Sequence, residues 1–168
     1  SVVCGTTMPA LRYFGRGEGV PSRLKSSGWT LVEHAKQADA MVIETYDNQD
    51  QDYRKRLEGT ITLVRNALDE IAVSQVKTLI IVTDQSSTAG EKRKGVDATN
   101  LQAACPNGIH GFGSLTAETL GRIAAQQGIT TRIFRLYNLN DDDAFQLLEQ
   151  GLQTEATNSD YEVMSFGA

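Results

Sequence analysis

Apolar runs alternate with helix-like patterns along this chain, which predicts an α/β domain built on a mainly parallel sheet. Several of the apolar runs are nearly continuous, as expected for strands that are buried on both faces. The predicted strands are residues 1–5, 40–45, 77–83, 131–138 and 161–166. We therefore expect residues 1–168 to form a single domain around a reduced sheet of about five strands.

Helical periodicity occupies the stretches between these strands. Apolar side chains at three- and four-residue spacing predict helices over 53–73 and 114–127, and Gly128 stands where a helix stop is expected. A last helix is predicted over 141–152, where three aspartates complement the positive end of the helix dipole. Residues 30–38 show a weaker helical pattern.

Two glycine-rich stretches, residues 12–28 and 84–112, have little hydrophobic periodicity and are predicted to be long loops. Long loops inside a compact domain are usually functional or bound to a partner. The first stretch contains Gly15, Gly17 and Gly19, but their spacing lacks the last interval of a dinucleotide fingerprint and follows no predicted strand. We interpret these glycines as a flexible turn.

Composition excludes several classes of protein. The net charge of −5 and the pI of about 5.0 disfavour nucleic acid as a partner. Two cysteines (Cys4, Cys105) and two histidines (His34, His110) supply no closely spaced ligand pairs, so no metal site is predicted. No apolar run reaches the roughly 18 residues of a membrane span. A chain that begins at Ser1 is compatible with a removed targeting segment.

Four segments carry a family resemblance. ADAMVIET at 38–45 is similar to a strand written ADVVIHLA, and LEGTITLVRNALDEIAVSQVKTLIIVTD at 57–84 is similar to the helix and strand that follow it. IHGFGSLTAETLGRIAAQQGITTRIFRLYNL at 109–139 resembles x-Y-G-x-S-K-L-x-A-E…I-L-R-P-x-N-V, and DYEVMSFG resembles G-E-V-Y-N-I-G. These motifs are similar to those of the extended short-chain dehydrogenase/reductase family, the NAD-dependent epimerases and dehydratases. The resemblance implies a Rossmann-like three-layer fold in a degenerate, truncated form.

The same resemblance implies that the family's chemistry is lost. The family's active tyrosine falls on His110, and the lysine that lowers the pKa of that tyrosine falls on Ser114, which offers only a neutral hydroxyl. The interval between the predicted strands 1–5 and 40–45 is too short for two further strands and for the acidic residue that holds the adenosine ribose. We therefore predict no catalytic residue and no cofactor.

The opening stretch SVVCGTTMPAL resembles the family's V-T-G-A-T-G-F-L-G loop. Gly5, Thr6 and Thr7 match in kind and are interpreted as vestigial cofactor-binding residues. Met8 and Leu11 replace glycines that would let the backbone approach a pyrophosphate.

The leading hypothesis is a non-catalytic accessory subunit that uses this fold to stabilise a larger protein assembly. Degenerate relatives favour an organellar photosynthetic or respiratory complex by analogy, peripheral to a membrane. The plastid stroma is favoured, with the mitochondrial matrix and the cytoplasm as alternatives. Aromatic residues and arginine concentrate at binding hot spots, so the predicted partner-binding residues are Arg12, Tyr13, Phe14 and Arg16.

The alternative hypothesis is an NAD(P)-linked oxidoreductase or a nucleotide-sensing protein, with Gly5, Thr6 and Thr7 holding the nucleotide and His110 as a replacement acid or base. Hydrolase chemistry from Ser86 and His110 is a third hypothesis, although the chain lacks a G-x-S-x-G elbow.

Overall fold

The computed structural model of the protein describes residues 9–15, 18–45, 52–83, 108–135, 142–153 and 161–165. Within these residues the chain forms a six-stranded sheet whose neighbouring strands all run parallel. The strands are β1 (Ala10–Phe14), β2 (Thr30–Val32), β3 (Ala40–Glu44), β4 (Thr78–Thr83), β5 (Thr130–Arg135) and β6 (Tyr161–Ser165). The helices are α1 (Gly19–Ser26), α2 (Tyr53–Ile71), α4 (Gly108–Gln126) and α5 (Asp142–Gln153), with a 3-10 turn η1 (Ala35–Gln37). The predicted α/β fold with a parallel sheet is confirmed.

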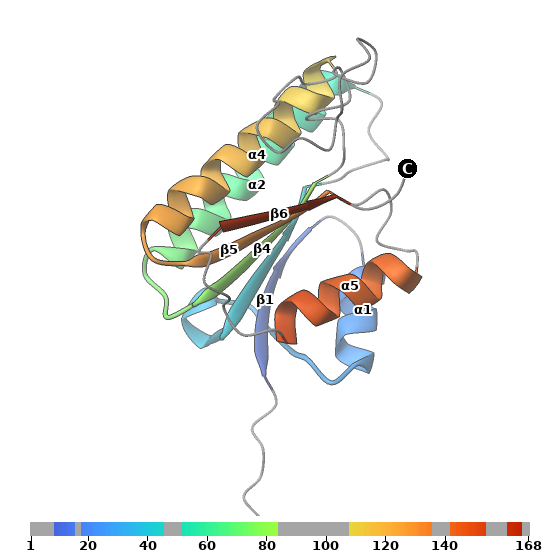
Figure 1. Ribbon diagram of the computed structural model, residues 1–168, viewed down its shortest axis with the longest axis vertical. Coiled ribbons are helices and arrows are strands. Elements are labelled where there is room, and N and C mark those ends of the chain that lie inside the picture. The colour runs from blue at the N-terminus through green and yellow to red at the C-terminus, as the bar shows by residue number, and fades with distance from the viewer. Residues whose placement is uncertain are drawn as a thin grey trace, which may run out of the picture.

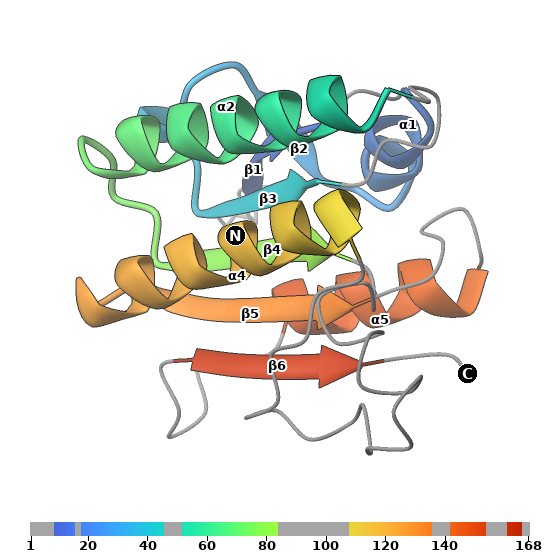
Figure 2. The same ribbon diagram turned by 90° about the horizontal axis from the view of Figure 1, so that it is seen from above.

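Helices cover both faces of the sheet, so the fold has three layers. The pair α2 and α4 lies side by side on one face, and α1 and α5 cover the other (Figure 1). Figure 2 shows the same layers from above, with the strands between the helices.

Two apolar cores fill the two interfaces, because alternate residues of each strand point to opposite faces. The core under α1 and α5 contains Leu11, Val20, Leu24, Val42, Ile80, Phe134, Phe145 and Leu148. The core under α2 and α4 contains Met41, Ile43, Val64, Ala67, Leu79, Ile81, Ala117 and Ile133. The near-continuous apolar runs of β3, β4 and β5 are explained by this burial on both sides.

The strand order is β2-β1-β3-β4-β5-β6. The chain moves outward from β1 to β2, crosses back past β1 to β3, and then continues outward to β6. The winding direction therefore reverses between β1 and β3. In open parallel sheets, ligands bind in the crevice outside the carboxyl ends of the strands at this reversal. The topology thus predicts a ligand site at the carboxyl ends of β1 and β3.

The N-terminal third differs from the prediction. The strand that enters the sheet is Ala10–Phe14, whereas the predicted strand 1–5 lies outside the described residues. The predicted loop 12–28 contains the end of β1 and all of α1, and the weakly helical stretch 30–38 contains β2 and only a 3-10 turn. The strand Ala10–Phe14 was missed because Arg12 interrupts its apolar residues. The charge of Arg12 is neutralised by Glu70, which is distant in the sequence.

Smaller differences occur in the other elements. Helix α4 begins at Gly108 rather than at 114, so the predicted loop 84–112 is helical over its last residues. The predicted stop at Gly128 is confirmed, because this residue has a φ of +90°, a conformation that favours glycine. Helices α2 and α5 and strands β3 to β6 lie within a few residues of their predicted positions.

Candidate functional site

A glycine run joins β1 to α1 at the reversal of the sheet. Phe14 ends the strand, Gly15 follows it directly, and the helix begins at Gly19. The sequence prediction that Gly15-x-Gly17-x-Gly19 follows no strand was therefore wrong: the run GRGEG connects a central strand to a helix. Residues 16 and 17 lie outside the described residues. In dinucleotide-binding sheets, a glycine-containing connection from a strand to a helix presents backbone N–H groups to a phosphate.

The backbone donors of the first turn of α1 are the N–H groups of Gly19 and Val20, because Pro21 has none and the Ser22 N–H donates to the Glu18 carbonyl oxygen at 3.1 Å. The N-cap residue Glu18 makes no side-chain capping hydrogen bond, and the turn contains no acidic residue. The first backbone N–H groups of any helix have no partner inside the helix and carry a partial positive charge. The helix dipole at the start of α1 favours an anion, and the exposed carboxylate of Glu18 opposes it.

Gly15 is required by the packing of its own strand. A Cβ atom at this position would lie 2.5 Å from the Tyr13 hydroxyl oxygen and 2.7 Å from the ring. Tyr13 is held there by a hydrogen bond from its hydroxyl to the Glu44 carboxylate. The Tyr13 hydroxyl thus lies against the first residue of the glycine run.

The Tyr13–Glu44 pair sits at the carboxyl ends of the two strands that flank the reversal. Burial, the nearby charge of Glu44 and the hydrogen bond to it raise the pKa of Tyr13 well above its usual range. Burial also raises the pKa of Glu44, an effect that the hydrogen bond from Tyr13 opposes. Both groups therefore favour their neutral forms more than they would in water.

Glu33 follows the last residue of β2 and is exposed. In dinucleotide-binding sheets, an acidic residue at this position, roughly 20 residues beyond the glycines, hydrogen-bonds the ribose. The prediction that the interval between residues 5 and 40 is too short for two further strands was wrong, because β1 and β2 both lie in it and β2 is only three residues long. A short apolar strand followed by Glu33 after a glycine run was the signal in the sequence that could have identified it.

A second polar cluster is buried where β4, β5 and α4 meet. The Arg135 guanidinium donates from Nε and Nη2 to the two carboxylate oxygens of Glu118, both at 2.8 Å, and Thr83 donates to Glu118 at 3.2 Å. All three residues are almost fully buried. The cluster ties the ends of two strands to α4 and is built as a structural bridge.

The two positions that the resemblance assigns to proton chemistry lie on α4. Ser114 is buried, with 5% of its surface exposed, so it does not present a hydroxyl to solvent. His110 lies in the first turn of the helix, and only its backbone is described. No described residue supplies the ammonium group that the resemblance places at position 114.

The predicted partner-binding and vestigial residues have mixed outcomes. Arg12, Tyr13 and Phe14 lie on β1 between β2 and β3, and each of their side chains is half-buried. Their contacts are internal, which argues against an exposed docking loop, although their role in binding a partner stays a prediction. Gly5, Thr6, Thr7, Met8 and Arg16 lie outside the described residues.

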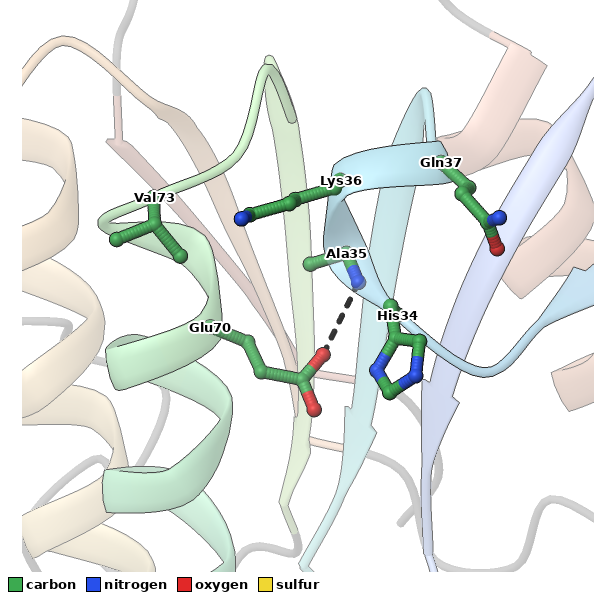
Figure 3. Close-up of a pocket in the computed structure, with 6 residues that line it drawn as sticks. All are labelled: His34, Ala35, Lys36, Gln37, Glu70 and Val73. Atoms are coloured by element: carbon green, nitrogen blue, oxygen red, sulfur yellow. Dashed lines mark hydrogen bonds between the residues drawn. The ribbon is translucent and has the colours of Figure 1, made fainter.

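A hollow of about 400 Å³ opens between η1 and the end of α2 (Figure 3), lined by His34, Ala35, Lys36, Gln37, Glu70 and Val73. Glu70 accepts from the backbone N–H of Ala35 at 3.0 Å and from Arg12 Nε at 3.1 Å. The Arg12 guanidinium also lies 4.0 Å from the centre of the Phe14 ring. The hollow borders the α2 face near the start of the strands, whereas the glycine run is at their carboxyl ends.

The Arg12–Glu70 contact predicts an acid-dependent contribution to stability. The hydrogen bond from Arg12 is the main cause that lowers the pKa of Glu70 below its ordinary value of 4.5. A lowered pKa contributes stability that is present above the unfolded-state pKa and lost as the pH falls through the folded-state pKa. Glu70→Gln should therefore destabilise the protein at neutral pH, and the difference from the wild type should shrink below about pH 4.5.

Urea unfolding at a series of pH values measures this difference. Glu58→Gln is the matched control, because Glu58 is exposed on the same helix. Curves for wild type and Glu70→Gln that stay parallel down to acidic pH would show that the contact contributes no acid dependence.

The described part of the chain contains no group of three or more His, Cys, Asp or Glu side chains arranged to hold a metal ion. Among the helices that the structure describes, none has the length and apolar character needed to cross a membrane.

No protein-family model and no curated protein matches this sequence. Solved structures match it. A short-chain dehydrogenase/reductase superfamily protein from Agrobacterium tumefaciens with bound NAD is 18% identical over 75% of this chain and 48% of its own, with a TM-score of 0.58. UDP-N-acetylglucosamine 4-epimerase from Bacillus cereus is 16% identical over 80% of this chain and 62% of its own, with a TM-score of 0.60.

A third match, MoeE5 in complex with UDP-glucuronic acid and NAD, is 10% identical over 95% of this chain and 76% of its own, with a TM-score of 0.69. This chain thus spans less than two thirds of the length of the first two proteins. The resemblance inferred from the sequence is confirmed at the level of the fold. The chain has the Rossmann-like fold seen in short-chain dehydrogenase/reductase and NAD-dependent epimerase structures.

Proposed function

We propose that this protein binds an adenine dinucleotide of the NAD type at the carboxyl ends of β1 and β2, as a nucleotide-sensing domain. The observation that carries the proposal is the connection from β1 through GRGEG to α1, located where the winding of the sheet reverses. A strand, a glycine turn and a helix N-terminus in this order form the phosphate-binding element of dinucleotide-binding sheets.

The described residues fit such a ligand at two points. The first turn of α1, which has no side-chain cap, offers the backbone N–H groups of Gly19 and Val20 to a pyrophosphate. The exposed carboxylate of Glu33 at the end of β2 can accept hydrogen bonds from ribose hydroxyls. Two solved structures with this fold support the proposal, because one is described with bound NAD and another with NADPH.

A bound nicotinamide dinucleotide would supply hydride transfer, but this chain departs from its family's proton-transfer residues. His110 and Ser114 occupy the positions of the family's tyrosine and lysine. The buried Ser114 hydroxyl carries no positive charge that could lower the pKa of a neighbouring acid. We therefore propose that the protein binds the dinucleotide and does not catalyse the family's reaction.

In the accessory-subunit hypothesis the fold binds other proteins, whereas in the dinucleotide hypothesis it binds a nucleotide. The structural matches favour the second, because the proteins named in them are described with nucleotides and cofactors. A protein partner and a plastid or mitochondrial location stay predictions.

Isothermal titration calorimetry of the chain with NAD⁺, NADH and NADP⁺ tests the proposed function. We expect micromolar binding of NAD⁺ or NADH and weaker binding of NADP⁺, because the Glu33 carboxylate repels a 2′-phosphate. The absence of heat for all three ligands up to millimolar concentration would overturn the proposal.

Glu33→Gln is expected to weaken NAD⁺ binding about 10- to 100-fold, because hydrogen bonds to a charged group contribute about 1.5–3 kcal/mol. The substitution also removes the charge that opposes a 2′-phosphate, so the preference for NAD⁺ over NADP⁺ should narrow. Glu58→Gln on α2 is the control and should leave both affinities unchanged. An unaltered NAD⁺ affinity in Glu33→Gln would exclude a contact between this carboxylate and the ligand.

A further inference from the structure

Glu33, the residue that the proposed function assigns to the ribose, lies in a short link between two fixed points of the backbone. Val32, directly before it, ends β2 and pairs with Arg12 of the neighbouring strand β1. Ala35 begins the 3-10 turn η1, and it is buried in the core under α2 and α4. Only Glu33 and His34 lie between these points, and both are exposed. The position of the Glu33 carboxylate therefore depends on how firmly Ala35 is held.

One carboxylate from a distant part of the sequence holds the backbone of Ala35. Glu70 Oε2 accepts a hydrogen bond from the Ala35 N–H at 3.0 Å, although the two residues are 35 positions apart (Figure 3). The same carboxylate accepts from Arg12 Nε at 3.1 Å and from Arg12 Nη2 at 3.2 Å. Two parallel hydrogen bonds from one guanidinium fix the orientation of a carboxylate. Glu70 of α2 therefore joins η1 to β1.

The helix that carries Glu70 is itself anchored on the sheet, because Ala67 and Ile71 of α2 are buried in the core between them. Arg12 contacts the end of β2 through its backbone and Glu70 through its side chain. The contacts therefore form a closed ring, which runs from β1 to β2, through the link that contains Glu33 to η1, and back to β1 through Glu70. Supporting contacts of this kind order a binding group before its ligand arrives.

We propose that Glu70 is a positioning residue for the dinucleotide site: it fixes the backbone at Ala35 and thereby holds the Glu33 carboxylate in place for the ribose. This inference rests on the proposed function and adds to it a residue that acts on binding without touching the ligand. An exposed side chain on a mobile backbone must be ordered when a ligand binds, and this ordering weakens binding. Glu70 orders the backbone beforehand, so less conformational freedom is lost in the complex.

Amide hydrogen exchange of the ligand-free chain, followed by NMR, tests the first step. In Glu70→Ala the Ala35 N–H loses its acceptor, so this amide should exchange about tenfold faster than in the wild type. Glu70→Gln keeps an oxygen that can accept from Ala35 and should give an intermediate rate. Asp69→Ala changes an exposed residue of the same helix and is the control, with no change expected at Ala35. Equal exchange of this amide in wild type and Glu70→Ala would overturn the inference.

Calorimetry with NAD⁺ tests the consequence for binding. Glu70→Ala should raise the Kd for NAD⁺ about 2- to 10-fold, the change that corresponds to the loss of one neutral hydrogen bond. Asp69→Ala should bind NAD⁺ as the wild type does. A Kd that is equal in wild type and Glu70→Ala would overturn the inference alone. A complete lack of NAD⁺ binding by the wild type would overturn the proposed function, and this inference with it.

A double-mutant cycle distinguishes positioning of Glu33 from a general loss of stability. If Glu70 acts through Glu33, Glu70→Ala should have little further effect on the Kd once Glu33→Ala has removed the ribose contact. A general loss of stability would weaken binding equally in both backgrounds, and that result would overturn the inference. Glu70→Gln, the smaller change, forms the same cycle if Glu70→Ala is not folded at the temperature of the titration.

Discussion

Replacing Glu118 with leucine is expected to lower the free energy of unfolding by about 3–5 kcal/mol, as measured by urea denaturation. Both side chains of the Glu118–Arg135 pair are about 95% buried, with exposed fractions of 5% and 4%, and are joined by two hydrogen bonds of 2.8 Å. Burial lowers the pKa of Arg135, but its contacts with Glu118 raise it more, so the guanidinium stays charged. Without Glu118, that charge would be buried without the carboxylate that compensates it in the described structure.

A double variant distinguishes the net contribution of the ion pair to stability from the destabilisation caused by removing only one partner. Glu118→Leu combined with Arg135→Met removes both charges, and it should recover most of the lost stability. Asp69→Asn breaks the exposed Arg65–Asp69 pair on α2, whose atoms lie 3.9 Å apart, and should change stability by only a few tenths of a kcal/mol. A loss below about 1 kcal/mol in Glu118→Leu would contradict the role given to this bridge.

Phe134→Ala is expected to destabilise the protein by about 3–5 kcal/mol, because the ring is buried in the core under α1 and α5. Gly151→Ala should also destabilise the wild type, by about 1–3 kcal/mol. A Cβ atom at Gly151 on α5 would lie 2.6 Å from the tip of the Phe134 ring, and that ring is buried.

The combination of the two substitutions gives the decisive measurement. In the Phe134→Ala background the ring is gone, so Gly151→Ala should no longer clash. It should instead stabilise the protein, by about 1 kcal/mol from the higher helix propensity of alanine. Urea denaturation of the four proteins forms a double-mutant cycle. Equal effects of Gly151→Ala in both backgrounds would show that the α5–β5 contact is not the reason for glycine at this position.

The regular elements from β3 onward were predictable because their signals are local. The strand AMVIE is apolar in its first four residues, since both faces of β3 are covered by helices. The amphipathic stripe of α2 is visible in the sequence because the helix buries one side against the sheet. Both patterns depend only on the burial of each residue, and burial correlates with residue type.

The candidate site was harder to predict because its residues come from segments far apart in the chain. The sequence shows the glycines of GRGEG, but they indicate a phosphate-binding connection only if a strand precedes them. Glu33 follows an apolar strand and Glu44 ends one. Apart from these positions, no local sequence pattern marks either residue as part of a site. Their roles depend on the reversal of the sheet between β1 and β3, which only the strand order reveals.

By itself, the sequence determined the α/β class, the parallel sheet and most of its helices, because hydrophobic periodicity records burial residue by residue. Only the tertiary structure decided that Ala10–Phe14 is a central strand. Arg12 is compatible with that position because Glu70, 58 residues away, neutralises its charge, and Tyr13 is satisfied by Glu44, 31 residues away. Polar side chains in a sheet are stabilised by partners that no local pattern contains, so the strand and the site it carries were visible only in three dimensions.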